Sequence, residues 1–139
     1  WIMQGSAHTI PGLSHQVLVQ IEIARGRIYC YPQRAGDVVI YKPKRGVHAP
    51  ARPLEVRWVV TGLRDGQYVR ILAKARGDRT FAGRGFQVGP DSNTITSGHP
   101  RHGAGPGHCF LWRYDVVLHG ERGRVLDRLD PGIIIKDYP

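Results

Sequence analysis

The stretch FLWRYDVVL, residues 110–118, decides the fold class of this chain because apolar and polar side chains alternate along it. Arg113 and Asp115 stand in the polar phase, and His119 follows them in the same phase. Successive side chains of a β-strand point to opposite faces, so a period of two predicts a strand with one buried face. Five apolar or aromatic residues share the buried phase: Phe110, Trp112, Tyr114, Val116 and Leu118.

Residues 17–23 and 54–60 show the same alternation, which predicts two more strands of this kind. Glycine and proline residues bound further short apolar runs, and these runs are the remaining predicted strands. We expect them at residues 28–31, 37–41, 67–74, 124–129 and 133–135, which makes eight strands in all, and residues 93–96 are only a candidate for one more. Residues 75–100 carry the weakest pattern, with Phe81, Phe86 and Val88 as the expected anchors to the core.

The 18 Gly and 10 Pro among 139 residues leave little room for long helices, and no helical apolar period is present. The sequence therefore predicts an all-β fold, a single immunoglobulin-like antiparallel β-sandwich of seven to eight short strands. A small β-barrel is the alternative. Residues 1–139 form one domain in this prediction, and residues 1–14 form an extended N-terminal segment. No apolar run approaches the roughly 20 residues that span a bilayer.

The buried phases of the predicted strands define a core between two sheets. Because burial of these side chains stabilises the fold, their truncation is expected to be costly. The predicted core residues are Val19, Ile21, Val56, Trp58, Val69, Ile71, Trp112, Tyr114, Val116 and Ile134.

The chain is strongly basic, with a formal net charge of +9, and this favours anionic partners. Only four of the 20 basic residues are lysines, and the basic residues are spread along the chain. A nucleic-acid face would need these charges to cluster beside exposed aromatic rings. The candidate nucleic-acid contacts are Lys42, Lys44, Arg45, Arg70, Lys74 and Arg76, with Tyr29, Tyr31, Tyr41 and Tyr68 as candidate stacking partners.

The two cysteines, Cys30 and Cys109, allow either one disulfide or two free thiols. In immunoglobulin domains a bridge joins the sheets beside a buried tryptophan, and Trp58 lies between the two cysteines in sequence. Cys109, however, is out of phase with Phe110 and should point away from the core face. We therefore expect two free thiols, with the bridge as the alternative.

A histidine-bearing loop, residues 99–107, precedes the strongest strand. The candidate metal ligands are His99, His102, His108 and Cys109, with His48 from another loop. Their spacing matches no zinc signature, and a blue-copper site would need a different arrangement of histidine, cysteine and methionine. We predict no metal and no other cofactor. The loop is expected to be exposed and mobile, with strand geometry beginning near residue 108.

No nucleophile, metalloprotease or phosphate-loop motif is present, and the dispersed carboxylates form no acid–base pair. His108 adjoins Cys109, but neighbouring strand residues face opposite sides and do not cooperate. The chain is therefore predicted to be non-catalytic. We expect a binding or scaffold domain that acts through loops or an edge strand, with another protein or a self-assembly partner. A nucleic-acid-binding domain is the alternative, and a cupredoxin-like metal protein is the third reading.

Overall fold

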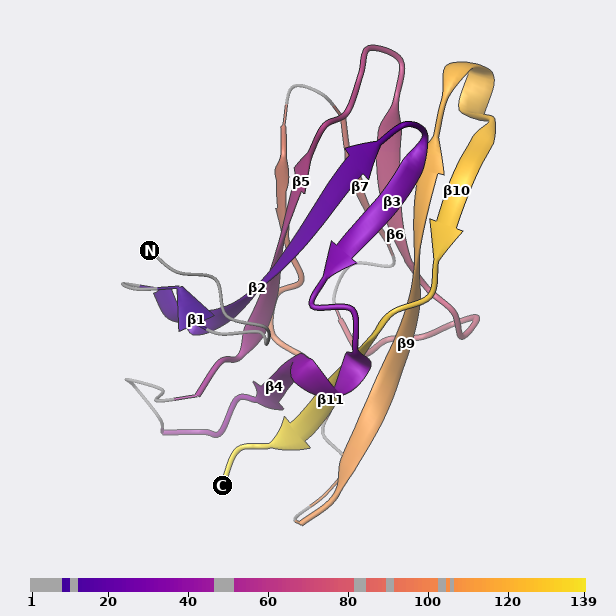
Figure 1. Cartoon of the computed structure of the whole chain (residues 1–139). Helices are drawn as coiled ribbons and strands as arrows, with labels where there is room; N and C mark the ends of the chain where they lie inside the picture. Colours follow the sequence, from indigo (N-terminus) through magenta and orange to yellow (C-terminus); the bar gives the residue numbers. More distant parts are fainter. Residues whose placement is uncertain are drawn as a thin grey trace.

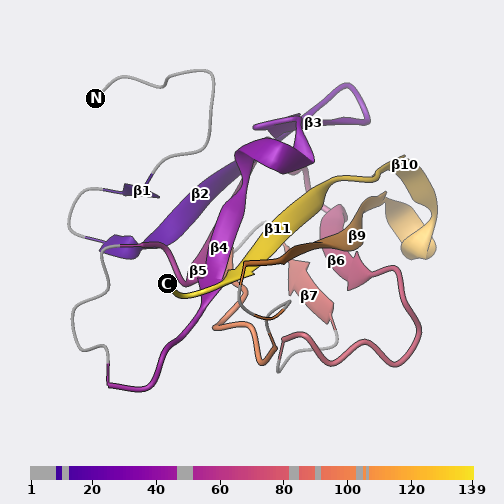
Figure 2. The same ribbon diagram turned by 90° about the horizontal axis from the view of Figure 1, so that it is seen from below.

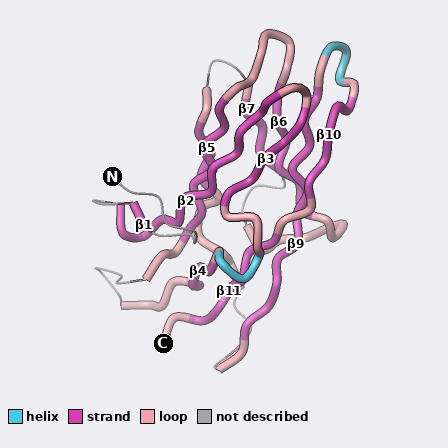
Figure 3. Tube along the Cα trace, viewed as in Figure 1, coloured by secondary structure: helices cyan, strands magenta, loops and turns pink. Residues whose placement is uncertain are grey.

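The described residues form two packed β-sheets, one of which curls into a half-barrel (Figure 1). The structure, a computed structural model, describes residues 9–10, 13–46, 52–81, 85–89, 92–102, 105 and 107–139. Within these ranges there is no α-helix, and the only helical turns are η1 (Ala35–Asp37) and η2 (Glu121–Gly123) (Figure 3). The predicted all-β fold is confirmed, whereas the finer likeness to an immunoglobulin domain stays a prediction.

The first sheet has the strand order β1-β2-β5-β8, and β3 also pairs with β2. Its strands are β1 (Thr9–Ile10), β2 (Leu13–Ala24), β3 (Arg27–Tyr31), β5 (Glu55–Thr61) and β8 (Thr94–Thr96). The second sheet has the order β4-β11-β9-β6-β7, and β10 also pairs with β9. Its strands are β4 (Val39–Lys42), β6 (Tyr68–Ala73), β7 (Gly85–Val88), β9 (Cys109–His119), β10 (Val125–Leu129) and β11 (Gly132–Asp137).

The strand count and the strand directions differ from the prediction in two respects. The described residues form eleven strands rather than seven or eight, with β1 and β7 among those that the alternation did not indicate. Most pairs are antiparallel, but β2 pairs with β5 and β4 pairs with β11 in parallel. Local patterns report which face of a strand is buried and not which strand lies beside it, so parallel pairing escapes them. The predicted N-terminal segment falls largely on residues 1–8 and 11–12, which lie outside the described residues.

The alternating segments supply the core, as the sequence predicts. In β2, Val17, Val19, Ile21 and Ile23 are buried, whereas Glu22 is exposed. The same alternation buries one face of β5, of β6 and of β9 against them. Nine of the ten predicted core residues are buried, so period-two alternation located the core without knowledge of the sheet order.

Aromatic rings of both sheets meet at the centre of this core. Trp58 of the first sheet and Tyr114 of the second are both fully buried, with ring centroids 5.7 Å apart. The indole N–H of Trp58 donates a hydrogen bond to the Tyr114 hydroxyl at 3.2 Å. Trp112 stacks on Tyr114 at 5.0 Å, and Phe81 meets Trp112 edge-on at 4.8 Å. The two sheets are thus joined by a polar contact inside an apolar core.

Ile134 and His119 correct the sequence prediction. Ile134 is only half-buried, while its neighbours Ile133 and Ile135 are fully buried. Three consecutive isoleucines carry no phase signal, so the buried face of β11 could not be chosen from the sequence alone. His119 is buried although it stands in the polar phase of β9. Its ring stacks on Tyr68 at 4.6 Å and its Nε2 accepts a hydrogen bond from Arg70 at 3.0 Å.

Strand β4 lies where the two sheets approach each other. Figure 2, which views the molecule from below, shows β4 between β5 and β11. The backbone N–H of Tyr41 in β4 donates to the Pro53 carbonyl at 2.9 Å, just before β5 begins. At another junction, the Ile28 N–H of β3 donates to the Asp127 carboxylate of β10 at 2.8 Å. The end of the molecule that carries β4, β11 and the start of β9 holds the candidate site.

Candidate functional site

Three strands of the second sheet place Tyr41, Lys136 and Cys109 in one row on the same face. Lys136 of β11 is paired with Tyr41 of β4 on one side and with Cys109 of β9 on the other. The preceding pair, Ile135 and Ile40, is fully buried on the core side. Because side chains alternate along a strand, the row that contains Lys136 faces outward. Cys109 is exposed, as its phase in the sequence predicts.

A groove of about 680 Å³ lies over this row. This size is in the range of ligand sites, which span about 300–1,000 Å³. We call it the basic groove. Its lining residues are Tyr41, Lys44, Arg52, Gly107, His108, Cys109, Lys136, Asp137, Tyr138 and Pro139.

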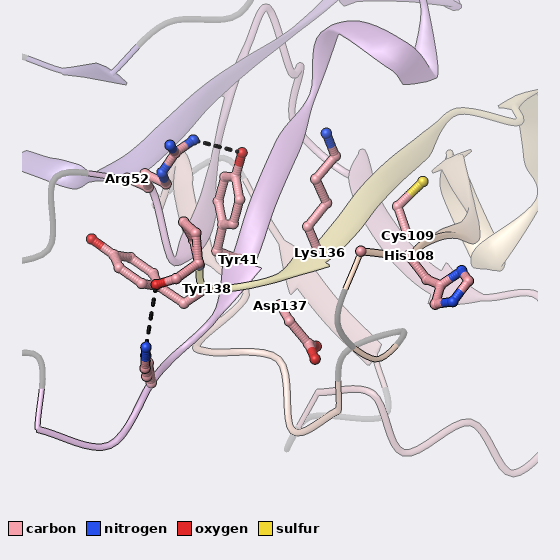
Figure 4. A pocket seen from close by; sticks show the side chains of 10 residues that line it. Tyr41, Arg52, His108, Cys109, Lys136, Asp137 and Tyr138 are labelled. Atoms are coloured by element: carbon pink, nitrogen blue, oxygen red, sulfur yellow. Dashed lines mark hydrogen bonds between the residues drawn. The ribbon is translucent and has the colours of Figure 1, made fainter.

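The charge of the basic groove is unbalanced towards the positive. Of its described lining residues, Lys44, Arg52 and Lys136 are cationic and Asp137 alone has an acidic side chain. Figure 4 shows Arg52 and Lys136 on one side of β11, whereas Asp137 points to the other side. Within the described part of the chain, no ion pair joins Arg52 or Lys136 to an Asp or Glu. Among the described residues, the cationic side of the groove therefore has no acidic side chain to offset its charge.

Arg52 and two tyrosines form an ordered wall of the groove. One N–H of the Arg52 guanidinium donates to the Tyr41 hydroxyl at 3.1 Å, and its central carbon lies 5.1 Å from the Tyr41 ring centroid. Tyr138 meets the Tyr41 ring edge-on at 6.1 Å. A guanidinium has five N–H donors in a planar fork that matches a carboxylate. Arg52 is thus oriented by Tyr41 while it retains donors for a ligand.

The candidate metal ligands are only partly brought together. His108 and Cys109 both line the basic groove, but Figure 4 shows their side chains on different sides of the strand, as the alternation predicts. His99 and His102 are exposed in the preceding loop, and His48 lies outside the described residues. The described ranges contain no group of three His, Cys, Asp or Glu side chains that could hold a metal. The absence of a bound metal stays a prediction.

The histidine-bearing loop is described only in part, since residues 103–104 and 106 fall outside the described ranges. His99, Arg101 and His102 are exposed, as predicted, but Pro100 is buried. The Arg101 N–H donates to the Thr80 carbonyl at 2.7 Å, so this part of the loop is attached to the core. Strand β9 begins at Cys109, which confirms the predicted boundary.

The six candidate nucleic-acid contacts lie on three separate parts of the chain. Lys42, Lys44 and Arg45 end or follow β4, beside the basic groove, and Arg76 lies in the turn after β6. The remaining two, Arg70 and Lys74, already have partners within the protein. Arg70 donates to His119.

Lys74 is held by two carboxylates. Its Nζ lies 2.9 Å from Asp115 and 3.4 Å from Asp130, and Arg113 also contacts Asp130 at 3.1 Å. The hydrogen bond to Asp115 is the main reason that the pKa of Lys74 is raised. An ammonium that already has two carboxylate partners is less available to a phosphate.

The candidate stacking tyrosines are also largely engaged. Tyr68 stacks on His119, and Tyr41 has Arg52 over its ring and Tyr138 at its edge. Tyr31 is half-buried, and Tyr29, which is 51% exposed, lies on β3. Base stacking requires an accessible ring face beside phosphate-binding cations. Of the described candidates, only Tyr41 and Lys44 line one groove together, and the other candidate rings and cations lie elsewhere.

Both thiols are free, as expected. Cys30 is buried, and burial raises its pKa from 9.0 to about 11. A thiolate is the reactive form, so this residue is unsuited to nucleophilic chemistry near neutral pH. Cys109 is exposed at the basic groove and is the accessible one of the pair.

Arg52, Lys136 and Tyr138 are among the groove residues that sequence reasoning missed. Arg52 stands in a proline-rich connection, and Lys136 and Tyr138 follow the isoleucine run of β11. They meet only because β11 lies between β4 and β9, which is a non-local pairing. One sequence signal pointed to this face. The alternation along residues 109–118 predicts that Cys109 faces outward, but it does not reveal the cations that lie beside it.

No family model, curated protein or solved structure matches this chain. None of the helical turns in the described residues is long and apolar enough to cross a membrane.

Proposed function

We propose that this protein is a non-catalytic binding domain that holds an acidic segment of a partner protein in its basic groove. The observation that carries this proposal is the arrangement of Lys44, Arg52 and Lys136 around one groove, where the one acidic side chain among the described lining residues, that of Asp137, points to the other side of the strand. Cations that share a groove repel one another, and carboxylates of a bound segment relieve that repulsion. Complementary charge also raises the rate of encounter with such a partner.

Several of the candidate rings and cations already make contacts within the protein, and this favours a protein partner over nucleic acid. Tyr41 and Tyr68 have ring contacts within the protein, and Lys74 has two carboxylate partners, Asp115 and Asp130. The remaining candidate cations are divided between the end of β4 and the turn after β6. A scattered distribution supports local recognition of carboxylates better than a continuous phosphate track. A second copy of this chain is disfavoured because each copy carries a net charge of +9.

The test is the binding of a fluorescein-labelled, glutamate-rich peptide, measured by fluorescence anisotropy. The double variant Arg52→Glu/Lys136→Glu reverses two charges of the groove, and we expect it to weaken binding at least about tenfold. The matched control is Arg64→Glu/Arg79→Glu, which changes net charge equally at two exposed positions outside the groove. The control should change the affinity by less than about threefold. Equal losses in the two variants would show a nonspecific charge effect and contradict the proposal.

The same assay with random single-stranded DNA tests the alternative. A domain that is not built for nucleic acid should bind it weakly, with a Kd of about 10⁻⁴–10⁻⁶ M at physiological salt. Tighter or sequence-selective DNA binding, with a steep loss of affinity as salt rises, favours the nucleic-acid reading over ours.

A further inference from the structure

A row of aliphatic side chains continues the outward face of the sheet beyond the basic groove. Ile134 of β11 is paired with Val39 of β4 on one side and with Leu111 of β9 on the other. Leu111 is 44% exposed, one of the few large hydrophobic side chains that the described surface leaves open, and the other two are half-buried. We call Val39, Ile134 and Leu111 the apolar row.

The apolar row and the row of Tyr41, Lys136 and Cys109 are adjacent and face the same way. They are two residues apart along each of the three strands, which corresponds to about 6.6–6.8 Å. Side chains two residues apart on an extended ligand have the same spacing. The spacing between the two rows therefore matches the spacing between alternate side chains of an extended ligand.

On the side of the apolar row away from the basic groove, the charged side chains are already paired with one another. Arg113, the next residue of β9 on the same face after Leu111, contacts Asp130, and Asp130 also contacts Lys74. The unneutralised charge lies on the other border, where Lys136 and Arg52 stand. This asymmetry gives a direction to any ligand that carries both apolar and acidic groups.

We infer that the partner segment is extended and amphipathic, with a bulky aliphatic residue on the apolar row and an acidic residue two positions away in the basic groove. The inference rests on the proposed function and adds the chemistry of the partner to it. Charge complementarity selects this occupant over a second copy of the chain, whose net charge is also +9. The apolar row gives affinity through burial, and the groove sets the orientation of the segment.

The first experiment varies the peptide and leaves the protein unchanged. Two peptides are compared, one with leucine two positions from a glutamate and one with alanine at the leucine position. The leucine peptide should bind about tenfold more tightly, as expected when a leucine side chain is largely buried. Equal affinity of the two peptides overturns the inference and leaves the carboxylate groove intact as a proposal.

The second experiment varies the protein. The variant Leu111→Thr/Ile134→Thr should bind both peptides with the affinity that the wild type shows for the alanine peptide. The matched control is Val125→Thr, which alters an exposed valine of β10 outside this face, and it should preserve the tenfold preference. If the preference survives in the double variant, the apolar row does not carry it. If Arg52→Glu/Lys136→Glu leaves the binding of both peptides unchanged, the proposed function itself fails.

The reactivity of Cys109 reports independently on where the peptide binds. Cys109 adjoins Leu111 and Lys136 on the same face, whereas Cys30 is buried and serves as an internal reference. The rate at which a maleimide alkylates Cys109 should fall at least about fivefold when the leucine peptide saturates the protein, because the peptide excludes the reagent from the groove. An unchanged rate at saturation means that the peptide binds elsewhere and refutes the inference.

Discussion

Replacement of Tyr114 by phenylalanine tests the contact that joins the two sheets. The change removes one oxygen atom from a residue that is 1% exposed and keeps the ring that packs on Trp112 and Trp58. The Trp58 N–H then loses its acceptor, and Trp58 itself is fully buried. A buried donor that is left without a partner costs about 1–3 kcal/mol. Because the apolar ring that remains is well suited to the core, we expect a net loss of about 1–2 kcal/mol in the free energy of unfolding.

Thermal unfolding followed by circular dichroism measures this loss. The entropy of unfolding at the midpoint scales with chain length, so 1 kcal/mol corresponds to about 3 °C in a domain of this size. The expected decrease in Tm is therefore about 3–7 °C. Tyr29→Phe is the control, since Tyr29 is 51% exposed and its variant should lie within about 0.5 kcal/mol of the wild type.

A double-mutant cycle with Trp58→Phe separates the hydrogen bond from changes in packing. If the 3.2 Å contact stabilises the fold, the two substitutions together should cost less than the sum of the single ones, by at least about 0.5 kcal/mol. Additive losses, or a Tyr114→Phe variant as stable as the wild type, refute this account of the core.

Three further predictions concern the core, the buried thiol and the loop histidines. Ile71→Ala should lower the free energy of unfolding by about 2–4 kcal/mol in chemical denaturation, because Ile71 is fully buried and truncation leaves a cavity; a loss below about 1 kcal/mol contradicts the predicted burial. Burial raises the pKa of Cys30 from 9.0 to about 11. The unfolded chain therefore releases this proton first as the pH rises, and the contribution of the thiol to the free energy of unfolding is fully present below pH 9. That contribution is lost as the pH rises from 9 to about 11, at up to about 1.4 kcal/mol per pH unit. Cys30→Ala should flatten this alkaline slope relative to Cys109→Ser, and identical slopes would count against the assignment. Zinc, copper and a chelator should leave the Tm unchanged, whereas an upward shift of several degrees that disappears in His99→Ala/His102→Ala/His108→Ala would show that the loop binds metal.

The sequence predicts this core well because alternation is a local property with a large energetic consequence. A register shift of one residue in β2 or β9 would expose the whole buried face, so the apolar phase had to point inward. The same logic placed Cys109 outside. It failed at Ile134, where apolar residues occupy both phases, and at His119, where Tyr68 and Arg70 of the neighbouring strand provide a buried polar site.

The candidate site could not be predicted because its residues meet through non-local pairing. Lys136 lies beside Tyr41 and Cys109 only in the folded sheet, and nothing in the three short segments encodes that order. The positions of the charged residues in the sequence did not reveal their partners for the same reason. The sequence analysis named Lys74 as a candidate phosphate contact, but folding brings Asp115 and Asp130 to it.

The most direct test of the basic groove is a titration of the ¹⁵N-labelled protein with the glutamate-rich peptide, followed by amide chemical shifts. We expect the largest shift changes at the end of β4, the end of β11 and the start of β9, around Tyr41, Lys136 and Cys109. The turn after β6, which carries Arg76 and Arg79, should remain unperturbed. Shift changes centred on that turn, or spread evenly over the basic residues, would contradict the claim that the groove is the binding site.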